Sequence, residues 1–250
     1  YALSSMGFTW EYQIAIMLFP ATMYAFMLVG CEFPSLDVEI DTTSSNAKAL
    51  LSPLFVFFFL VMTITATTEL GTQGWISEIL ATSGATPMLI LALITGIMAI
   101  GRYFAGPLVH SLNPVGVLVV SALLSTLGLF LLSQFSGAMV YVAAVVFALG
   151  VTYFWPTMLG CVAEYLPKTG ALGLSLVGGA GMAGVAIFNP IIGAWADEAK
   201  QNAISNGISG TELTIASSQA ILSNLLVFPI LLIFMFSGLY LYRRKSVRQS

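Results

Sequence analysis

Residues 51–75 read LSPLFVFFFLVMTITATTELGTQGW, and this stretch decides the fold class. Residues 51–68 carry no charge, and a membrane-spanning helix needs about 20 mainly apolar residues. Glu69 follows them, and Gln73 stands four residues later. An ionisable side chain within a span is costly unless it faces a partner or a polar cavity. The stretch therefore predicts a membrane-spanning helix in which the Glu69 carboxylate faces a partner or a polar cavity.

The whole chain has the composition of an integral membrane protein. Of its 250 residues, 58% are hydrophobic and 8% are charged, whereas a soluble domain has roughly 25% charged residues. The mean hydropathy is +0.95. Cys31 and Cys161 lie in different segments without motif spacing, so we expect free thiols. Because the sequence has no metal-ligand cluster, nucleotide loop or serine–histidine pair, we expect no enzyme activity, cofactor, metal site or nucleic-acid partner.

Hydropathy predicts an all-α polytopic bundle of seven transmembrane helices. Turn residues separate the apolar segments, as at Ser83-Gly84 and Asn113-Pro114. The predicted spans are residues 12–30, 51–80, 87–109, 115–134, 138–166, 171–195 and 221–242.

Basic residues set the orientation of these helices. If the spans alternate in direction, all basic residues except Lys200 fall on one side, which the positive-inside rule makes cytoplasmic. We therefore expect a protein of the inner (plasma) membrane, embedded in the lipid bilayer with a cytoplasmic C-terminus.

The connections between spans predict four parts. Residues 1–30 would be the last helix of an N-terminal bundle, 31–50 a cytoplasmic linker, 51–242 a six-helix bundle and 243–250 a cytoplasmic tail. The chain begins with Tyr1 rather than Met and has no signal-peptide pattern. We interpret it as part of a longer polypeptide whose N-terminal half is missing.

Several segments resemble the major facilitator superfamily. GRYFAGPLVHSLNPVGVL, residues 101–118, resembles the second copy of the family's G-x-L-x-D-R-x-G-R loop. Gly106 and Leu108 match that pattern, whereas its charged and later glycine positions hold other residues. Three longer segments are similar to helices seven, ten and eleven of bacterial sugar porters and fucose–proton symporters. These are TELGTQGWI (68–76), TYFWPTMLGCVAEYLPKTGALGLSLVGGAGMAG (152–184) and FNPIIGAWAD (188–197).

The resemblance implies the C-terminal half, plus the preceding helix, of a secondary active transporter that works by alternating access. Its substrate site would lie near the midplane between two halves. The implied activity is proton-coupled uptake of a sugar or similar polyhydroxylated solute, with protons as the coupling ion. The alternatives are a membrane sensor or receptor of the same fold, and an exporter of drugs or anions. An anion carrier would need Arg or Lys inside a span, and we expect none there.

Glu69, Gln73 and Trp75 are the first candidates for a substrate or coupling site. Helical spacing places Thr65, Glu69 and Gln73 on one stripe, which we expect to face a central cavity. Trp75 joins this stripe only if the two glycines after Glu69 break the helix. Glu69 has three open roles: proton carrier, acceptor for substrate hydroxyls, or a carboxylate that meets water at the outer headgroups. Gln73 and Trp75 suit sugar recognition, or else serve as a polar cap and an interfacial anchor.

Three further candidates lie in the fifth and sixth predicted spans. Tyr153 and Trp155, beside Pro156, would line a sugar site or else pack against lipid and core. Asn189 would hydrogen-bond with Glu69, or else satisfy the backbone groups that Pro190 frees.

Arg102, Gly106 and Glu164 are candidates for a cytoplasmic gate. Arg102 falls at the cytoplasmic end of the third predicted span, and Gly106 belongs to the loop motif beside it. Arg102 would form an ion pair with Glu164, or else extend its guanidinium to the membrane surface.

Overall fold

The protein is described by a computed structural model covering residues 2–31, 48–80 and 86–249, which divide into two units, residues 1–41 and 42–250. The boundary between the units falls inside the predicted linker, 31–50. Most of that linker and the predicted turn at residues 83–84 lie outside the described residues.

The first unit consists of short helices. They are α1 (Ala2–Ser5), α2 (Trp10–Ala15) and α3 (Leu18–Leu28). The predicted span 12–30 is therefore interrupted at residues 16–17. Pro20 supplies the reason, because it has no N–H to donate to the Ile16 carbonyl four residues earlier.

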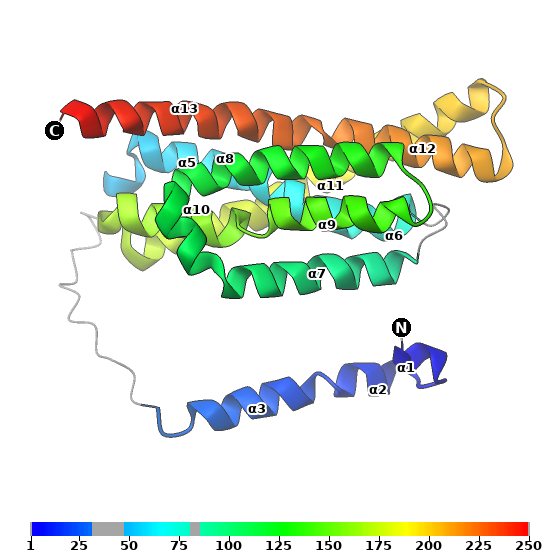
Figure 1. Ribbon diagram of the computed structural model, residues 1–250, viewed down its shortest axis with the longest axis horizontal. Helices are drawn as coiled ribbons and strands as arrows, with labels where there is room; N and C mark the ends of the chain where they lie inside the picture. The colour runs from blue at the N-terminus through cyan, green and yellow to red at the C-terminus, as the bar shows by residue number, and fades with distance from the viewer. Residues whose placement is uncertain (1, 32–47, 81–85, 250) are drawn as a thin grey trace. The chain divides into compact units, whose positions relative to one another are not determined.

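The second unit is a bundle of long helices, with no strand in any described residue (Figure 1). Its elements are α5 (Pro53–Ala66), η1 (Thr67–Gly71, a π-helix), α6 (Thr72–Ile79), α7 (Pro87–Tyr103), α8 (Ala105–Gln134), α9 (Met139–Val151), α10 (Phe154–Tyr165), η2 (Pro167–Thr169, a 3₁₀ turn), α11 (Gly170–Ser205), α12 (Gly210–Leu225) and α13 (Val227–Gln249).

Five helical stretches among the described residues are long and apolar enough to cross a membrane. They are Pro53–Ile76, Ser111–Gln134, Met139–Tyr165, Pro167–Ser205 and Gly210–Arg244. The helices α3 and α7 are apolar but shorter, with 11 and 17 residues. The all-α class and the character of an integral membrane protein are thus confirmed, whereas a count of seven spans is not.

Two helices continue beyond their predicted ends. The helix α11 runs ten residues past the predicted end at 195, through Asp197, Glu198 and Lys200, to Ser205. The helix α13 runs through the predicted tail as far as Gln249. Hydropathy marks where a segment stops being apolar, but a helix continues for as long as its backbone bonds form. Residues 198–218, which lie between the last two predicted spans, are therefore mostly helical.

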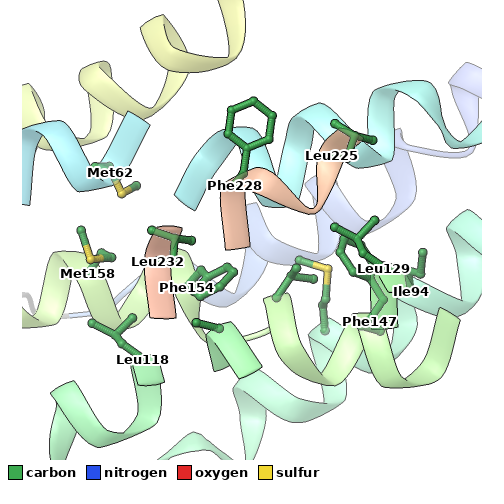
Figure 2. Packing of buried hydrophobic residues seen from close by; sticks show 14 of the residues in the cluster. Met62, Ile94, Leu118, Leu129, Phe147, Phe154, Met158, Leu225, Phe228 and Leu232 are labelled. Atoms are coloured by element: carbon green, nitrogen blue, oxygen red, sulfur yellow. The ribbon is translucent and has the colours of Figure 1, made fainter. Parts of the chain in front are cut away.

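The core of the second unit is one cluster of buried apolar side chains from all of its long helices. Figure 2 shows part of this cluster, to which Phe154 of α10 and Leu232 of α13 both belong. The rings of Phe154 and Phe236 join α10 to α13, with centroids 6.3 Å apart.

Glycine allows α11 to pack closely against its neighbours. A Cβ on Gly184 would lie 2.6 Å from both the Cα and the carbonyl oxygen of Thr63 in α5. A Cβ on Gly181 would lie 3.0 Å from the Trp155 ring of α10. By contrast, Gly179 on the same helix has no atom within 4 Å of such a Cβ. The small residues of α11 thus serve close helix packing at some positions and not at others.

We predict that Gly184→Ala destabilises the bundle, whereas Gly179→Ala does not. The added methyl at 184 overlaps the Thr63 backbone, and such overpacking costs about 1–3 kcal/mol of unfolding free energy. At 179 the methyl meets open space, and alanine gains up to about 1 kcal/mol of helix propensity. Denaturant unfolding of the purified protein in detergent measures both variants. Equal stabilities would contradict the α11–α5 packing.

Candidate functional site

Glu69 and Arg102 form an ion pair inside the second unit. The Arg102 Nη2 atom donates to Glu69 Oε1 at 2.9 Å. The Glu69 side chain is only 4% exposed, whereas that of Arg102 is 39% exposed. The Arg102 Nε atom also donates to the carbonyl oxygen of Thr152 at 2.9 Å. One guanidinium therefore connects η1, α7 and the junction between α9 and α10.

Pro156 explains why the Thr152 carbonyl is available to Arg102. In a continuous helix, the N–H of residue 156 would donate to the carbonyl of residue 152, but proline has no N–H. The backbone departs from regular helix here, since α9 ends at Val151 and α10 begins at Phe154. Arg102 provides the missing donor.

Glu69 lies on a wide helical turn. Residues Thr67–Gly71 form a π-helix between α5 and α6. The hydroxyls of Thr67 and Thr68 donate to the carbonyls of Thr63 and Ile64, at 2.7 and 2.8 Å. Single π-helical turns within α-helices occur frequently at functional sites.

Arg102 lies beside a third irregular point. The helix α7 ends at Tyr103, and Phe104, with φ −95° and ψ 18°, separates it from α8. The Tyr153 hydroxyl donates to the carbonyl of Gly101 at 3.0 Å. A Cβ on Gly101 would lie 2.8 Å from Thr152 Cγ2, so glycine is needed for this close approach.

The ion pair lies near the middle of a candidate span, although Arg102 itself belongs to the last turn of α7. Thr152 stands at the midpoint of the candidate span Met139–Tyr165, about 20 Å from either end at 1.5 Å per residue. Arg102 is thus at the end of α7, as predicted for its helix, but it lies beside the middle of the neighbouring span Met139–Tyr165 and not beside an end of that span. The predicted third span, 87–109, is two helices divided at Phe104, and Arg102 belongs to the first of them.

The predicted partner of Arg102 is wrong. Glu164 is exposed near the end of α10, where it lines a separate cavity with Arg243 and Arg244. Gly106 is exposed in the first turn of α8, with no atom within 4 Å of an added Cβ.

Two buried oxygen atoms of the site have no hydrogen-bond partner among the described residues. They are Glu69 Oε2 and Thr72 Oγ1. An unpaired buried polar atom costs free energy, so these atoms mark where a proton, a water molecule or a substrate hydroxyl would be favourable.

The other candidates on α6 lie close to Glu69 in sequence but have different surroundings. The Gln73 Nε2 atom donates to the Met98 sulfur at 3.4 Å, and a thioether is a weak acceptor. The half-buried Trp75 ring lies against Gly193 of α11. The condition for Trp75 to join the Glu69 stripe is not met, because Gly71 belongs to the π-helix and α6 continues through residue 74.

The predicted open stripe is wrong in part. Thr65 and Glu69 are buried inside the second unit instead of facing an open cavity, and Gln73 is half-buried.

The remaining candidates lie on α10 and α11. Tyr153 is half-buried against Gly101, and Trp155 is half-buried against Gly181. Asn189 is exposed, and within the described part of the chain no hydrogen bond joins it to Glu69. The structure thus brings Glu69, Arg102 and Tyr153 together and leaves Asn189 apart.

We predict strong energetic coupling between Glu69 and Arg102. Arg102→Gln leaves a buried carboxylate unpaired, which costs about 3 kcal/mol of unfolding free energy. Glu69→Gln costs less, because the Arg102 side chain is partly exposed. The double variant should lose less than the sum of the two, by about 1–3 kcal/mol. Denaturant unfolding in detergent measures this cycle.

The matched control is the same cycle with Glu164→Gln in place of Glu69→Gln. Because Arg102 does not pair with Glu164, the two losses should add. Additive losses for Glu69 and Arg102 would contradict the ion pair.

No family model, curated protein or solved structure matches this chain in comparisons with known proteins. Among the residues whose side chains are described, no group of three or more His, Cys, Asp or Glu residues is placed to hold a metal ion.

Proposed function

We propose that this protein is a secondary active transporter of the major facilitator type, working by alternating access with proton coupling. One observation carries the proposal. An ion pair between buried Glu69 and partly exposed Arg102 lies where three irregular points meet, near the middle of a candidate span. These points are the π-helix Thr67–Gly71, the end of α7 at Phe104 and the α9–α10 junction at Thr152. Transporters characteristically place interrupted helices and their coupling sites near the bilayer midplane.

The ion pair suits a role in coupling. Intramembrane ionisable residues are costly to retain and mark proton or substrate pathways. A proton on Glu69 would neutralise the carboxylate and remove its attraction for Arg102. Arg102 would then keep only the Thr152 carbonyl as its acceptor. Proton binding and release would thus weaken and restore a contact between η1 and α7, which is the kind of two-state contact that alternating access requires.

The surrounding side chains suit a polyhydroxylated solute such as a sugar. Within the described residues the Gln73 amide donates to a sulfur atom alone, so it is available to substrate hydroxyls. Trp75 and Trp155 are half-buried aromatic rings of the kind that pack against a pyranose ring. Tyr153 would orient Arg102 through Gly101. Asn189, exposed on α11, would contact a substrate rather than Glu69. The N-terminal bundle expected in the same polypeptide would supply the opposite wall.

The proposal also includes the orientation of the protein in the membrane. All basic residues except Lys200 fall on one side of an alternating set of seven spans, which favours a cytoplasmic C-terminus in the inner (plasma) membrane. In this arrangement α3 and α7 are spans as well, with α7 continued by the first turns of α8.

An anion carrier is the second candidate, and Arg102 favours it. The sequence predicted no basic side chain inside a span, but the contact of Arg102 with mid-span Thr152 contradicts that prediction. When Glu69 is ionised it neutralises Arg102, so an anion would bind there only together with a proton. A receptor of the same fold remains the alternative from another class.

We predict that Glu69→Gln abolishes accumulation driven by a pH gradient but leaves counterflow exchange intact. The variant keeps the side-chain shape and removes the titrating group. Labelled sugars and, in a parallel arm, labelled organic anions would be supplied to the full-length polypeptide in proteoliposomes. Glu164→Gln, which alters an exposed carboxylate without an ion pair in the described part of the chain, is the control and should retain both activities.

Each outcome of this assay distinguishes the candidates. Wild-type accumulation by Glu69→Gln would contradict the coupling role. Exchange of anions but not sugars would favour the anion carrier. Specific ligand binding without exchange by the unmodified protein would favour a receptor.

A further inference from the structure

A cavity of about 540 Å³ opens at one end of the second unit. It is lined by Asn113, Pro114, Val115, Glu164, Tyr165, Tyr240, Arg243 and Arg244. Three candidate spans end here, since Tyr165 and Arg244 are the last residues of their spans and Asn113 is the third residue of Ser111–Gln134. The cavity therefore lies at the level where the helices leave the hydrocarbon, which is the level of the lipid headgroups.

Arg243 is held in a fixed orientation at this cavity. Its guanidinium carbon lies 3.5 Å from the centre of the Tyr165 ring. This cation–π contact orients the planar guanidinium without using its N–H donors. Within the described residues, no hydrogen bond or ion pair joins Arg243 or Arg244 to an acceptor. The guanidinium groups therefore have donors available for a ligand.

The charge of the cavity favours a singly charged anion. Arg243 and Arg244 contribute two positive charges and Glu164 one negative charge, so the lining carries a net charge of plus one. Glu164 forms no ion pair with either arginine among the described residues, so it does not neutralise them by direct contact.

The backbone adds a smaller favourable contribution. Asn113 has φ 57° and interrupts α8. Its Oδ1 atom accepts a hydrogen bond from the Gly116 N–H at 2.9 Å. The part of α8 that follows Asn113 thus begins at the cavity. The partial positive charge of its N-terminus lies at the same end of the bundle as Arg243 and Arg244.

We propose that this cavity binds a phosphate group, carried by the headgroup of an anionic phospholipid or present as free phosphate. Arginine binds phosphate oxygens through paired N–H donors, and a phosphodiester carries one negative charge, which matches the net charge of the lining. Tyr165 and Tyr240 are residues that favour the interface between lipid and water. A bound phosphate would tie α8, α10 and α13 together. The inference is independent of the proposed transport activity.

Native mass spectrometry of the full chain in neutral detergent tests the site. The probes are phosphatidylglycerol, diacylglycerol with the same acyl chains but no phosphate, and inorganic phosphate as a competitor. Wild-type protein should bind phosphatidylglycerol more tightly than diacylglycerol. Arg243→Gln should weaken phosphatidylglycerol binding about tenfold, because it removes a charge-assisted phosphate contact, and leave diacylglycerol binding unchanged.

The matched control is Lys168→Gln, which removes an exposed charge that lines a different cavity. It should change phosphatidylglycerol binding by less than about twofold, because exposed charges elsewhere contribute little. If Arg243→Gln does not fold, Arg243→Lys keeps the charge but loses the planar donors, and should still bind more weakly.

The competitor separates the two sources of phosphate. Displacement of phosphatidylglycerol by millimolar inorganic phosphate would assign the site to free phosphate. If phosphatidylglycerol stays bound in its presence, the site is assigned to a lipid headgroup.

Equal binding of phosphatidylglycerol and diacylglycerol, or equal losses in Arg243→Gln and Lys168→Gln, would overturn the proposal.

Discussion

Arg102 joins two groups that an apolar interior cannot leave unpaired, the Glu69 carboxylate and the Thr152 carbonyl. The need for this donor arises from Pro156, which deprives Thr152 of its helical partner. The close approach that satisfies both groups requires a glycine at 101 and a bend at Phe104. The bend after α7, the α9–α10 junction and the π-helix around Glu69 are thus all positioned so that the Arg102 guanidinium can pair with both acceptors.

The same rule explains the contrast between the two arginine sites. Arg102, near mid-span, has both an anionic and a neutral acceptor from the protein. Arg243, where the spans end, has an aromatic face but no acceptor among the described residues. Inside the hydrocarbon the protein has to supply every partner itself, whereas at the headgroup level water and lipid phosphates supply them. The donors of Arg102 are therefore engaged within the protein, whereas those of Arg243 are free for the proposed phosphate ligand.

Much of the fold was predictable because the bilayer imposes simple requirements on the sequence. Length and hydropathy predicted an all-α membrane protein, and Asn113-Pro114 predicted the interruption in α8. Helix ends were less predictable, as α11 shows by continuing through Asp197 and Glu198. Polarity reports where a helix leaves the hydrocarbon and not where its backbone bonds stop. Phe104 interrupts the third predicted span, and Pro107, which has no N–H to donate to the Tyr103 carbonyl, is the local signal of this interruption.

The sequence by itself determined which residues need a partner: Glu69, because a carboxylate in an apolar segment is costly, and Thr152, because Pro156 stands four residues later. Only the tertiary structure decided that Arg102 is the partner of both. Spacing along one helix relates residues on that helix, but carries no information about which residue of another helix lies at the same depth. The bend at Phe104 and the close contact at Gly101 set that depth, and they depend on how α7 packs against α9 and α10.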